Sequence, residues 1–450
     1  MASIVKRGSK YSVVYNYENE KGMRKQKWET FATHTEAKKR KIQVEFKKST
    51  KTFIAPSAKT LRNLLEEYVS IYGINTWALS TYEARRALID NYINPLIGSM
   101  KLDKITPKIM DDFYRNLRTV EAKSQFCREN ENKFVSARVV KEIHKVLSSA
   151  FNQAIKWELI ERNPVSHATL PKCSAATREI WTADILFEAV KLCNDEVLTL
   201  ALNLAFSCSL RMGEMLGLTW SCVDISEENI RKGCASILVN KELQRVTKQA
   251  LLELENKDVI KIFPAVIVSK HTSLVLKLPK TKTSIRKIFL PNTVARMLAE
   301  RKKYLEEMKE LQGNEFVDND LVFCNVIGKP MEGQVINRAL NQLIRENGLP
   351  KIVFHSLRHS SITYKLKLTG GDMKAVQGDS GHSRVQMVAD VYSHILDDDR
   401  QINAQRFEEE FYRDEKAEEN GGNIERCSVK EILLKLTEKP EIVELLKALL

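Results

Sequence analysis

The stretch from residue 354 to residue 395 contains the side chains best suited to phosphate chemistry. Its motifs are F-H-S-L-R-H at 354–359, G-H-S at 381–383 and V-Y-S-H-I at 391–395. His355 and Arg358 are three residues apart, so a helix presents them on neighbouring turns of one face. His382 follows a Gly-Asp-Ser-Gly loop, and Tyr392 comes ten residues later. Cations and hydrogen-bond donors beside a phenol predict a tyrosine nucleophile that attacks a phosphodiester.

This chemistry needs a second guanidinium group and a proton donor from elsewhere in the chain. Arg211 lies one helical turn from Glu214, whose carboxylate can hold the guanidinium group in place. Arg211 and Arg358 can each direct two N–H groups at phosphate oxygens and neutralise the transition state. Lys282, expected at the tip of a hairpin, can protonate the leaving 5′ oxygen.

The two histidines and the tyrosine need different things from their surroundings. His355 and His382 titrate near neutral pH, so they can donate protons, accept them or hydrogen-bond the phosphate. Tyr392 has an ordinary pKa of about 10, so it needs cations beside it to act as a nucleophile. Taken alone, H-x-L-R-H is more often structural and R-x-x-E is more often a surface ion pair. The prediction therefore depends on the order and spacing of all the motifs together.

The composition favours a nucleic-acid partner. The formal net charge of +13 and a pI near 9.2 indicate a polyanionic partner, with a membrane surface or a merely basic surface as alternatives. No apolar run approaches the ~18 residues of a membrane span, and we expect neither a membrane partner nor a signal peptide. The eight cysteines show no metal-ligand spacing. This argues against a metal site or a disulfide framework and predicts a reducing cytoplasm.

Residues 1–52 form the most basic block of the chain. Alternating residues at 11–17 and 25–31, followed by a helix from Thr35, predict a small sheet with one helix. A basic aromatic sheet suits DNA contact by strands in a groove, and a solvated charged face is the alternative. The cations expected to contact DNA are Lys6, Arg7, Lys10, Arg24, Lys25 and Lys27, together with Lys280 and Arg286 beside Lys282.

Residues 60–165 have the periodicity of a helical bundle. Thr106-Pro107 predicts a helix start, and Asn163-Pro164 ends the last helix. A plain bundle without a DNA role is the alternative interpretation of these residues. Residues 413–450 are acidic and then amphipathic, which predicts a helical tail that packs on its own chain or on a sister subunit.

Residues 176–412 predict a mixed, mainly helical domain with a small sheet. Segments 274–278 and 286–290 are expected to form the hairpin around Lys282. The stretch at 244–272 has the character of an insertion, and no role follows from its residues. The predicted fold class is multidomain α+β, with a sheet-plus-helix N-terminal domain, a helical bundle and a mainly α domain that carries the hairpin.

These motifs resemble the tyrosine recombinase, or phage integrase, family over nearly the whole chain to about residue 412. The matching motifs are S-L-R-M-G-E-M-L-G-L-T-W at 209–220, P-K-T-K-T-S-I-R-K-I-F-L-P at 279–291, H-S-L-R-H at 355–359, G-H-S at 381–383 and V-Y-S-H-I at 391–395. The resemblance implies that the catalytic residues are Arg211, Lys282, His355, Arg358, His382 and Tyr392. It also implies an arm-type DNA-binding domain at 1–52, a core-binding domain at 60–165 and a catalytic domain at 176–412. Gly378-Asp379-Ser380 departs from the leucines usual before the Gly-His, and the tail is longer than typical.

The resemblance implies a site-specific recombinase of a phage or of an integrative or conjugative element. A homotetramer would hold double-stranded DNA at core and arm sites, with accessory DNA-bending or excision factors. Tyr392 would form a 3′-phosphotyrosine, and strand exchange would proceed through a Holliday junction without metal or ATP. One alternative is a type IB-like topoisomerase, which uses the same chemistry without synapsis. Another is a non-catalytic DNA-binding regulator, which predicts degenerate active-site positions.

Overall fold

The computed structural model describes residues 2–18, 23–50, 59–124, 133–172, 179–264, 271–386, 388–389 and 405. The chain divides into two compact units, Met1–Ser361 with Asp379–Ser383 and Ile362–Gly378 with Arg384–Leu450. The expected tail at 413–450 and Tyr392 lie outside the described residues. None of the helices in these ranges combines the length and apolar composition needed to cross a membrane.

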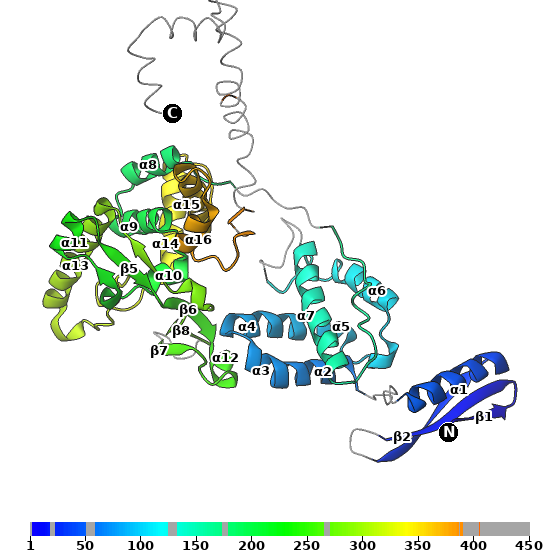
Figure 1. The fold of residues 1–450 in the computed structure, drawn as a ribbon. Coiled ribbons are helices and arrows are strands. Elements are labelled where there is room, and N and C mark those ends of the chain that lie inside the picture. The colour runs from blue at the N-terminus through cyan, green and yellow to red at the C-terminus, as the bar shows by residue number, and fades with distance from the viewer. Residues whose placement is uncertain are drawn as a thin grey trace, which may run out of the picture. The chain divides into compact units, whose positions relative to one another are not determined.

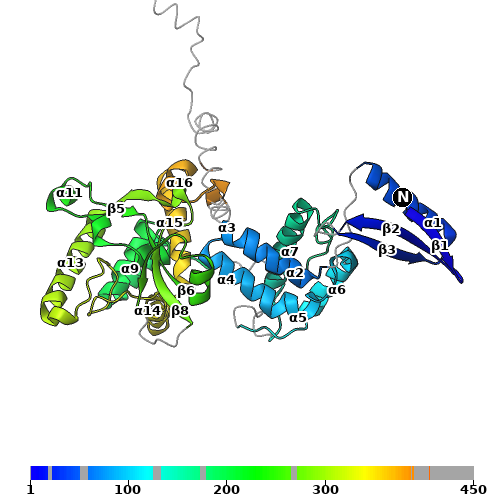
Figure 2. The ribbon, with the colours of Figure 1, turned by 90° about the horizontal axis from the view of Figure 1, so that it is seen from below.

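The N-terminal segment is a three-stranded antiparallel sheet with one helix along it (Figures 1 and 2). Its elements are β1 (Ala2–Arg7), β2 (Lys10–Glu18), β3 (Arg24–Phe31) and α1 (His34–Ser49). The helix begins with a capping box, in which the Thr33 side chain accepts from the Glu36 amide and the Glu36 carboxylate accepts from the Thr33 amide. Val13 and Tyr15 of β2 are buried with Ala37 and Val44 of α1.

The described residues at 59–124 and 133–172 are helical wherever they form regular structure, apart from isolated bridges. The elements are α2 (Leu61–Glu67), the π-helical turn η1 (Tyr68–Gly73), α3 (Ile74–Thr76), α4 (Leu79–Leu88), the π-helical turn η2 (Ile89–Ile93), α5 (Asn94–Ile97), the 3-10 turn η3 (Leu102–Lys104), α6 (Pro107–Leu117) and α7 (Ala137–Lys156). The expected start at Thr106-Pro107 is confirmed, because the Thr106 side chain accepts from the Ile109 amide. Asn163 bonds the carbonyl of Ser148 in α7 and so closes the segment onto that helix.

The region that carries the catalytic motifs mixes helices with short strands. Its elements are α8 (Ala183–Leu192), α9 (Glu196–Ser207), α10 (Met212–Leu216), η5 (Trp220–Cys222), β4 (Val223–Asp224), α11 (Glu227–Arg231), β5 (Ser236–Val239), β6 (Glu242–Thr247), α12 (Lys248–Glu253), β7 (Val259–Phe263), β8 (Thr272–Lys277), η6 (Lys282–Ser284), β9 (Arg286–Phe289), α13 (Asn292–Gln312), η7 (Gly313–Glu315), α14 (Gly333–Glu346), α15 (Phe354–Leu368) and α16 (Met373–Ser380). The fold is α+β, with helices predominating over three small sheets in the described ranges.

The expected hairpin around Lys282 is wrong. β8 pairs with β6 and β7, whereas β9 pairs with β5, so the two strands belong to different sheets. The alternation of apolar residues correctly predicted the strand β8, but it did not predict which strands pair with it. The insertion supplies those partners as β6 and β7, and Ala250 and Leu251 of its helix α12 belong to the same buried cluster as the helices of 61–156. Lys282 therefore begins a 3-10 turn on the connection between two sheets.

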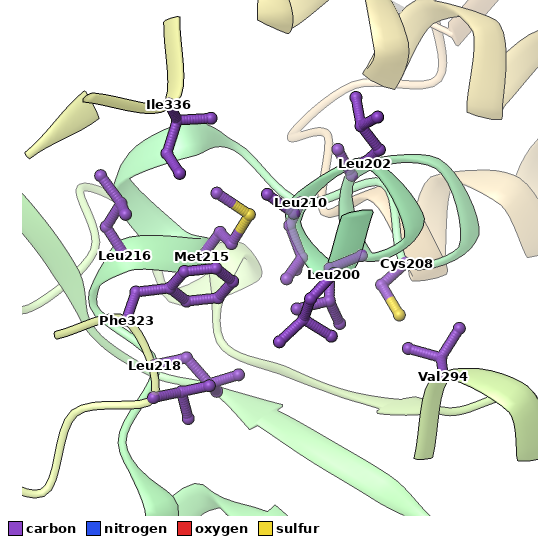
Figure 3. Packing of buried hydrophobic residues seen from close by; sticks show 14 of the residues in the cluster. Leu200, Leu202, Cys208, Leu210, Met215, Leu216, Leu218, Val294, Phe323 and Ile336 are labelled. Atoms are coloured by element: carbon purple, nitrogen blue, oxygen red, sulfur yellow. The ribbon is translucent and has the colours of Figure 1, made fainter. Parts of the chain in front are cut away.

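The largest buried cluster supports the segment from α9 to α10. Figure 3 shows Leu200 and Leu202 of α9 beside Leu210, and Met215 of α10 facing Phe323. All of these side chains are at most 3% exposed, and each fully buried side chain of this size stabilises the fold by about 1.5–3 kcal/mol. This packing fixes the turn on which Arg211 lies.

The second unit has a small cluster of its own within its described residues. Ile362 and Leu366 of α15 pack with Val376 of α16 and with Val388. Apolar contacts therefore join the two sequence segments that make up this unit.

Candidate active site

Arg211 and Glu214 form the ion pair that their spacing predicted. Arg211 is the residue before α10, its Nη1 donates to Glu214 Oε1, and its backbone N–H donates to Glu214 Oε2 at 3.1 Å. The Glu214 side chain is 2% exposed and that of Arg211 34% exposed. The carboxylate is therefore buried, while part of the guanidinium group still reaches solvent.

Arg358 lies at the centre of the site and is 1% exposed. Its guanidinium group donates to the carbonyl oxygens of Ser209 and Ser380, which come from segments far apart in sequence. Ser209 adopts a φ of 52°, a left-handed conformation that is unusual for serine and turns its carbonyl toward Arg358. Burial, followed by the nearby Arg211 charge, lowers the pKa of Arg358 to about 9. The group therefore remains a cation at neutral pH and is held by two carbonyl groups.

His382 is the imidazole that the fold brings to Arg358. Its Nε2 lies 3.3 Å from Arg358 Nη2, and its Nδ1 lies 2.8 Å from the hydroxyl of Ser380. Burial, followed by the charges of Arg358 and Arg211, lowers the pKa of His382 to about 4. His382 is therefore neutral at physiological pH, able to accept a proton or to donate one N–H to a phosphate oxygen.

His355 is the second residue of α15 and is exposed, in contrast to His382. Its ring meets the ring of His359 edge-on, with centroids 5.0 Å apart and planes at 89°. The two imidazoles are one helical turn apart and lie on the same side of the helix as neighbours. His355 thus faces solvent on the helix that carries Arg358. His359 was not among the site residues predicted from the sequence.

The side chains of two predicted catalytic residues, Lys282 and Tyr392, lie outside the described part of the chain. The backbone of Lys282 is described in η6, but its side chain lies outside the described part of the chain, as does the whole of Tyr392. Lys280, just before η6, is exposed. The residues that the structure does bring together are Arg211, Glu214, Arg358 and His382.

Arg286, which was expected to contact DNA, is buried. It is 8% exposed and donates to both carboxylate oxygens of Glu214. A signal for this burial was present in the sequence, since Arg286 shares one face of β9 with the apolar Ile288 through the two-residue period of a strand. The charged neighbours of Arg286 hid that signal.

Ser380 is a site residue that sequence reasoning missed. It is fully buried, its carbonyl accepts from Arg358, and its hydroxyl bonds the His382 ring. Gly378-Asp379-Ser380, which replaces the leucines usual in the family, thus supplies a hydroxyl group that orients the His382 ring.

Replacing Ser380 by alanine is expected to slow DNA cleavage by roughly 3- to 30-fold, because the His382 ring loses the partner that fixes its orientation. The folded protein should lose only about 1 kcal/mol, since one buried hydrogen bond is removed. Single-turnover cleavage and thermal unfolding measure the two effects. Ser383→Ala, at an exposed neighbouring serine, is the control and should cleave at the wild-type rate.

Acid is expected to destabilise the protein through His382. Its pKa is about 4 in the folded protein against 6.5 for the ordinary side chain, so the unfolded chain takes up this proton first. The groups that face it and disfavour its charge are Arg358, Arg211, His359 and Arg286. Proton uptake at His382 therefore leaves the free energy of unfolding unchanged above pH 6.5. It lowers that free energy by up to about 3 kcal/mol as the pH falls toward 4. Unfolding free energies of the wild type and of His382→Gln, measured between pH 4 and 7.5, should diverge in this window; parallel curves would contradict the assignment.

Comparison with known sequences gives two family matches and several relatives. A profile of the Phage integrase family matches residues 228–399, and a profile of the phage integrase N-terminal SAM-like domain matches residues 60–118. Together they span just over half of the chain. The tyrosine recombinase XerC-like protein of Caldanaerobacter subterraneus subsp. tengcongensis is 25% identical over 270 residues, which cover 58% of this chain and 63% of that protein. The ICEBs1 integrase of Bacillus subtilis is 21% identical over 318 residues, which cover 70% of this chain and 73% of that protein.

Comparison with solved structures identifies an integrase whose fold is similar to that of this chain. The Tn1549 transposon integrase, solved in complex with a circular intermediate DNA, aligns with a TM-score of 0.59 at 18% identity. The alignment covers 78% of this chain and 100% of that chain. The profile matches, the relatives and this shared fold agree with the motifs. The chain belongs to the phage integrase family of tyrosine-type site-specific recombinases.

Proposed function

We propose that this chain is the integrase of a mobile genetic element, acting on double-stranded DNA through Tyr392. The Tyr392 oxygen attacks the scissile phosphorus and forms a 3′-phosphotyrosine, and the bond to the 5′ oxygen breaks. Lys282 gives that oxygen its proton, while His355 and His382 are the acceptors available for the phenol proton. Because the phosphotyrosine retains the energy of the phosphodiester, the freed 5′ hydroxyl can attack the partner strand's phosphotyrosine and form a Holliday junction.

The observation that carries this proposal is the convergence of four side chains from three distant segments. Arg211 and Glu214 come from the start of α10, Arg358 comes from α15, and His382 follows α16; each arginine has fixed hydrogen-bond partners. Two guanidinium groups beside a neutral imidazole suit the charge that develops on the non-bridging oxygens of a cleaved phosphate. The printed names of the relatives, an integrase of ICEBs1 and a transposon integrase bound to DNA, support a mobile-element substrate.

The domain roles form part of the same proposal. Residues 60–165 would hold the core site together with the catalytic region at 176–412, and residues 1–52 would bind the arm site. In the N-terminal sheet, the register pairs Arg7 with Lys10 on the face opposite α1, and Arg24 lies on that face too. Arg7 also stacks on Trp28, with the guanidinium carbon 4.3 Å from the ring centroid. Lys6, Lys25 and Lys27 alternate onto the helix-covered face, so the open face is the better candidate for DNA contact.

A nicked suicide substrate tests the proposal. The attachment site is first located by footprinting the protein on the DNA that flanks its own gene. A nick beside the scissile phosphate lets the cleaved fragment diffuse away and traps the covalent protein–DNA product, which a denaturing gel resolves. We expect an adduct linked to the 3′ phosphate through tyrosine; its absence from a protein that binds the site would favour the non-catalytic regulator.

Strand exchange separates recombination from topoisomerase activity. Two labelled duplexes with cognate sites should yield recombinant products and a Holliday junction, formed by a homotetramer in the bacterial cytoplasm with or without accessory factors. Relaxation of a supercoiled plasmid without any recombinant product would instead identify a type IB-like topoisomerase.

A further inference from the structure

We propose that Arg286 is a positioning residue, which sets the orientation of Arg211 and His382 without touching DNA. This inference rests on the proposed recombinase function. The three guanidinium nitrogen atoms of Arg286 donate in different directions. Nε donates to the Asp379 carbonyl at 2.8 Å, Nη1 donates to the Ser284 carbonyl at 3.0 Å, and Nη2 donates to Glu214 Oε2 at 3.0 Å. One side chain thus joins α10, the end of the turn that begins at Lys282, and the end of α16.

The first consequence concerns the charge on Arg211. Glu214 accepts hydrogen bonds from both Arg211 and Arg286, and its side chain is 2% exposed. Without Arg286, the buried carboxylate would be paired with Arg211 alone, and that pair would have no net charge. With Arg286 present, the three groups together carry one positive charge, which the partly exposed Arg211 can present to a phosphate.

The second consequence concerns the turn before His382. Gly381 has a φ of +65°, and a Cβ atom placed there would lie 2.9 Å from Arg286 Nη1 and 3.1 Å from its Cδ and Cζ. The turn therefore rests directly on the guanidinium group, with no space for a side chain. The hydrogen bond from Nε to the Asp379 carbonyl holds the same turn from its other end. Arg286 thus supports the backbone that aims His382 at Arg358.

Only arginine satisfies this geometry. A lysine keeps the charge but donates from a single point, so it cannot reach the Asp379 carbonyl, the Ser284 carbonyl and Glu214 together. A misplacement of about 1 Å in a catalytic group can slow a reaction by ~100-fold. Arg286→Lys is therefore expected to slow adduct formation by roughly 10- to 100-fold.

The test separates binding from chemistry on the nicked substrate. For Arg286→Lys, the Kd for the cognate duplex and the slope of its salt dependence should stay within about twofold of wild type, because no phosphate contact is lost. The single-turnover rate of adduct formation at saturating DNA should fall by the roughly 10- to 100-fold expected from the misplacement. Arg286→Ala should be slower still, and added guanidinium ions should restore part of its rate, whereas ammonium ions should not.

Lys287→Ala is the matched control, since Lys287 is the next residue of β9 and points to the exposed face. It should form adducts at the wild-type rate. A salt slope reduced by about one in Arg286→Lys, with a normal rate at saturating DNA, would make Arg286 a DNA contact and overturn the inference. An unchanged rate with unchanged binding would also overturn it. If wild type and Lys287→Ala both form no adduct, the recombinase function itself fails.

A substitution at Gly381, which contacts Arg286, tests the same role if the Arg286 variants misfold. Gly381→Ala leaves Arg286 in place, presses on its guanidinium group and strains the turn at a positive φ. Slower adduct formation with unchanged DNA affinity supports the positioning role even if Arg286→Ala does not fold. A wild-type rate in Gly381→Ala would contradict it.

Discussion

Tyr392→Phe is expected to eliminate the covalent protein–DNA adduct while leaving DNA affinity unchanged. The variant lacks only the phenolic oxygen, the atom that bonds to phosphorus, so no slower version of the same step remains. The measurement pairs a denaturing gel of the nicked substrate with a binding titration on the intact duplex.

Tyr304→Phe, in α13, removes a phenolic oxygen outside the catalytic motifs and serves as the control. It should form adducts like wild type. An adduct that persists in Tyr392→Phe would show that another residue is the nucleophile. Loss of DNA binding in the same variant would mean that the hydroxyl group has a structural role instead.

Arg358→Lys is expected to slow adduct formation by about 10²–10³-fold, the usual cost of losing one fixed donor to a developing oxyanion. Arg358→Ala should also destabilise the fold by ~2–5 kcal/mol, because the buried carbonyls of Ser209 and Ser380 lose their donor. Single-turnover rates, normalised to the folded fraction, and thermal unfolding separate these two losses.

Arg301 provides the matched control for Arg358. It is a half-buried arginine of α13 that also donates to two carbonyl groups, those of Val322 at 3.3 Å and Cys324 at 2.7 Å. Arg301→Lys should destabilise the protein to a comparable extent but leave the rate per folded molecule unchanged. Equal slowing in both variants would mean that Arg358 acts through stability alone.

The sequence predicted those parts of the site that depend on local geometry. The spacing of Arg211 and Glu214 suffices, because residues three apart on a helical turn meet whatever the tertiary context. The start of α6 at Pro107 is equally local, since the Thr106 cap and the proline both act within one turn. His355 and Arg358 were likewise placed on one helix by their spacing, and α15 confirms this.

The failures concern contacts between distant segments. β9 was expected to pair with β8, yet a strand's own residues do not reveal which neighbour it pairs with, and β5 is the partner. Arg286 was grouped with surface cations because its buried acceptor, Glu214, lies 72 residues earlier. The hydroxyl of Ser380 could not be assigned from the sequence, because its partner ring is positioned by the backbone turn at Gly381.

The carboxylate shared by two arginines has a consequence for how the pocket responds to acid. Burial alone would raise the pKa of Glu214, but the Arg286 and Arg211 guanidinium groups outweigh burial and hold that pKa below its ordinary value. Glu214 therefore keeps its negative charge at a lower pH than an ordinary glutamate would. The hydrogen bonds that join this carboxylate to Arg211 and Arg286 are therefore retained at a lower pH than an ordinary carboxylate would allow.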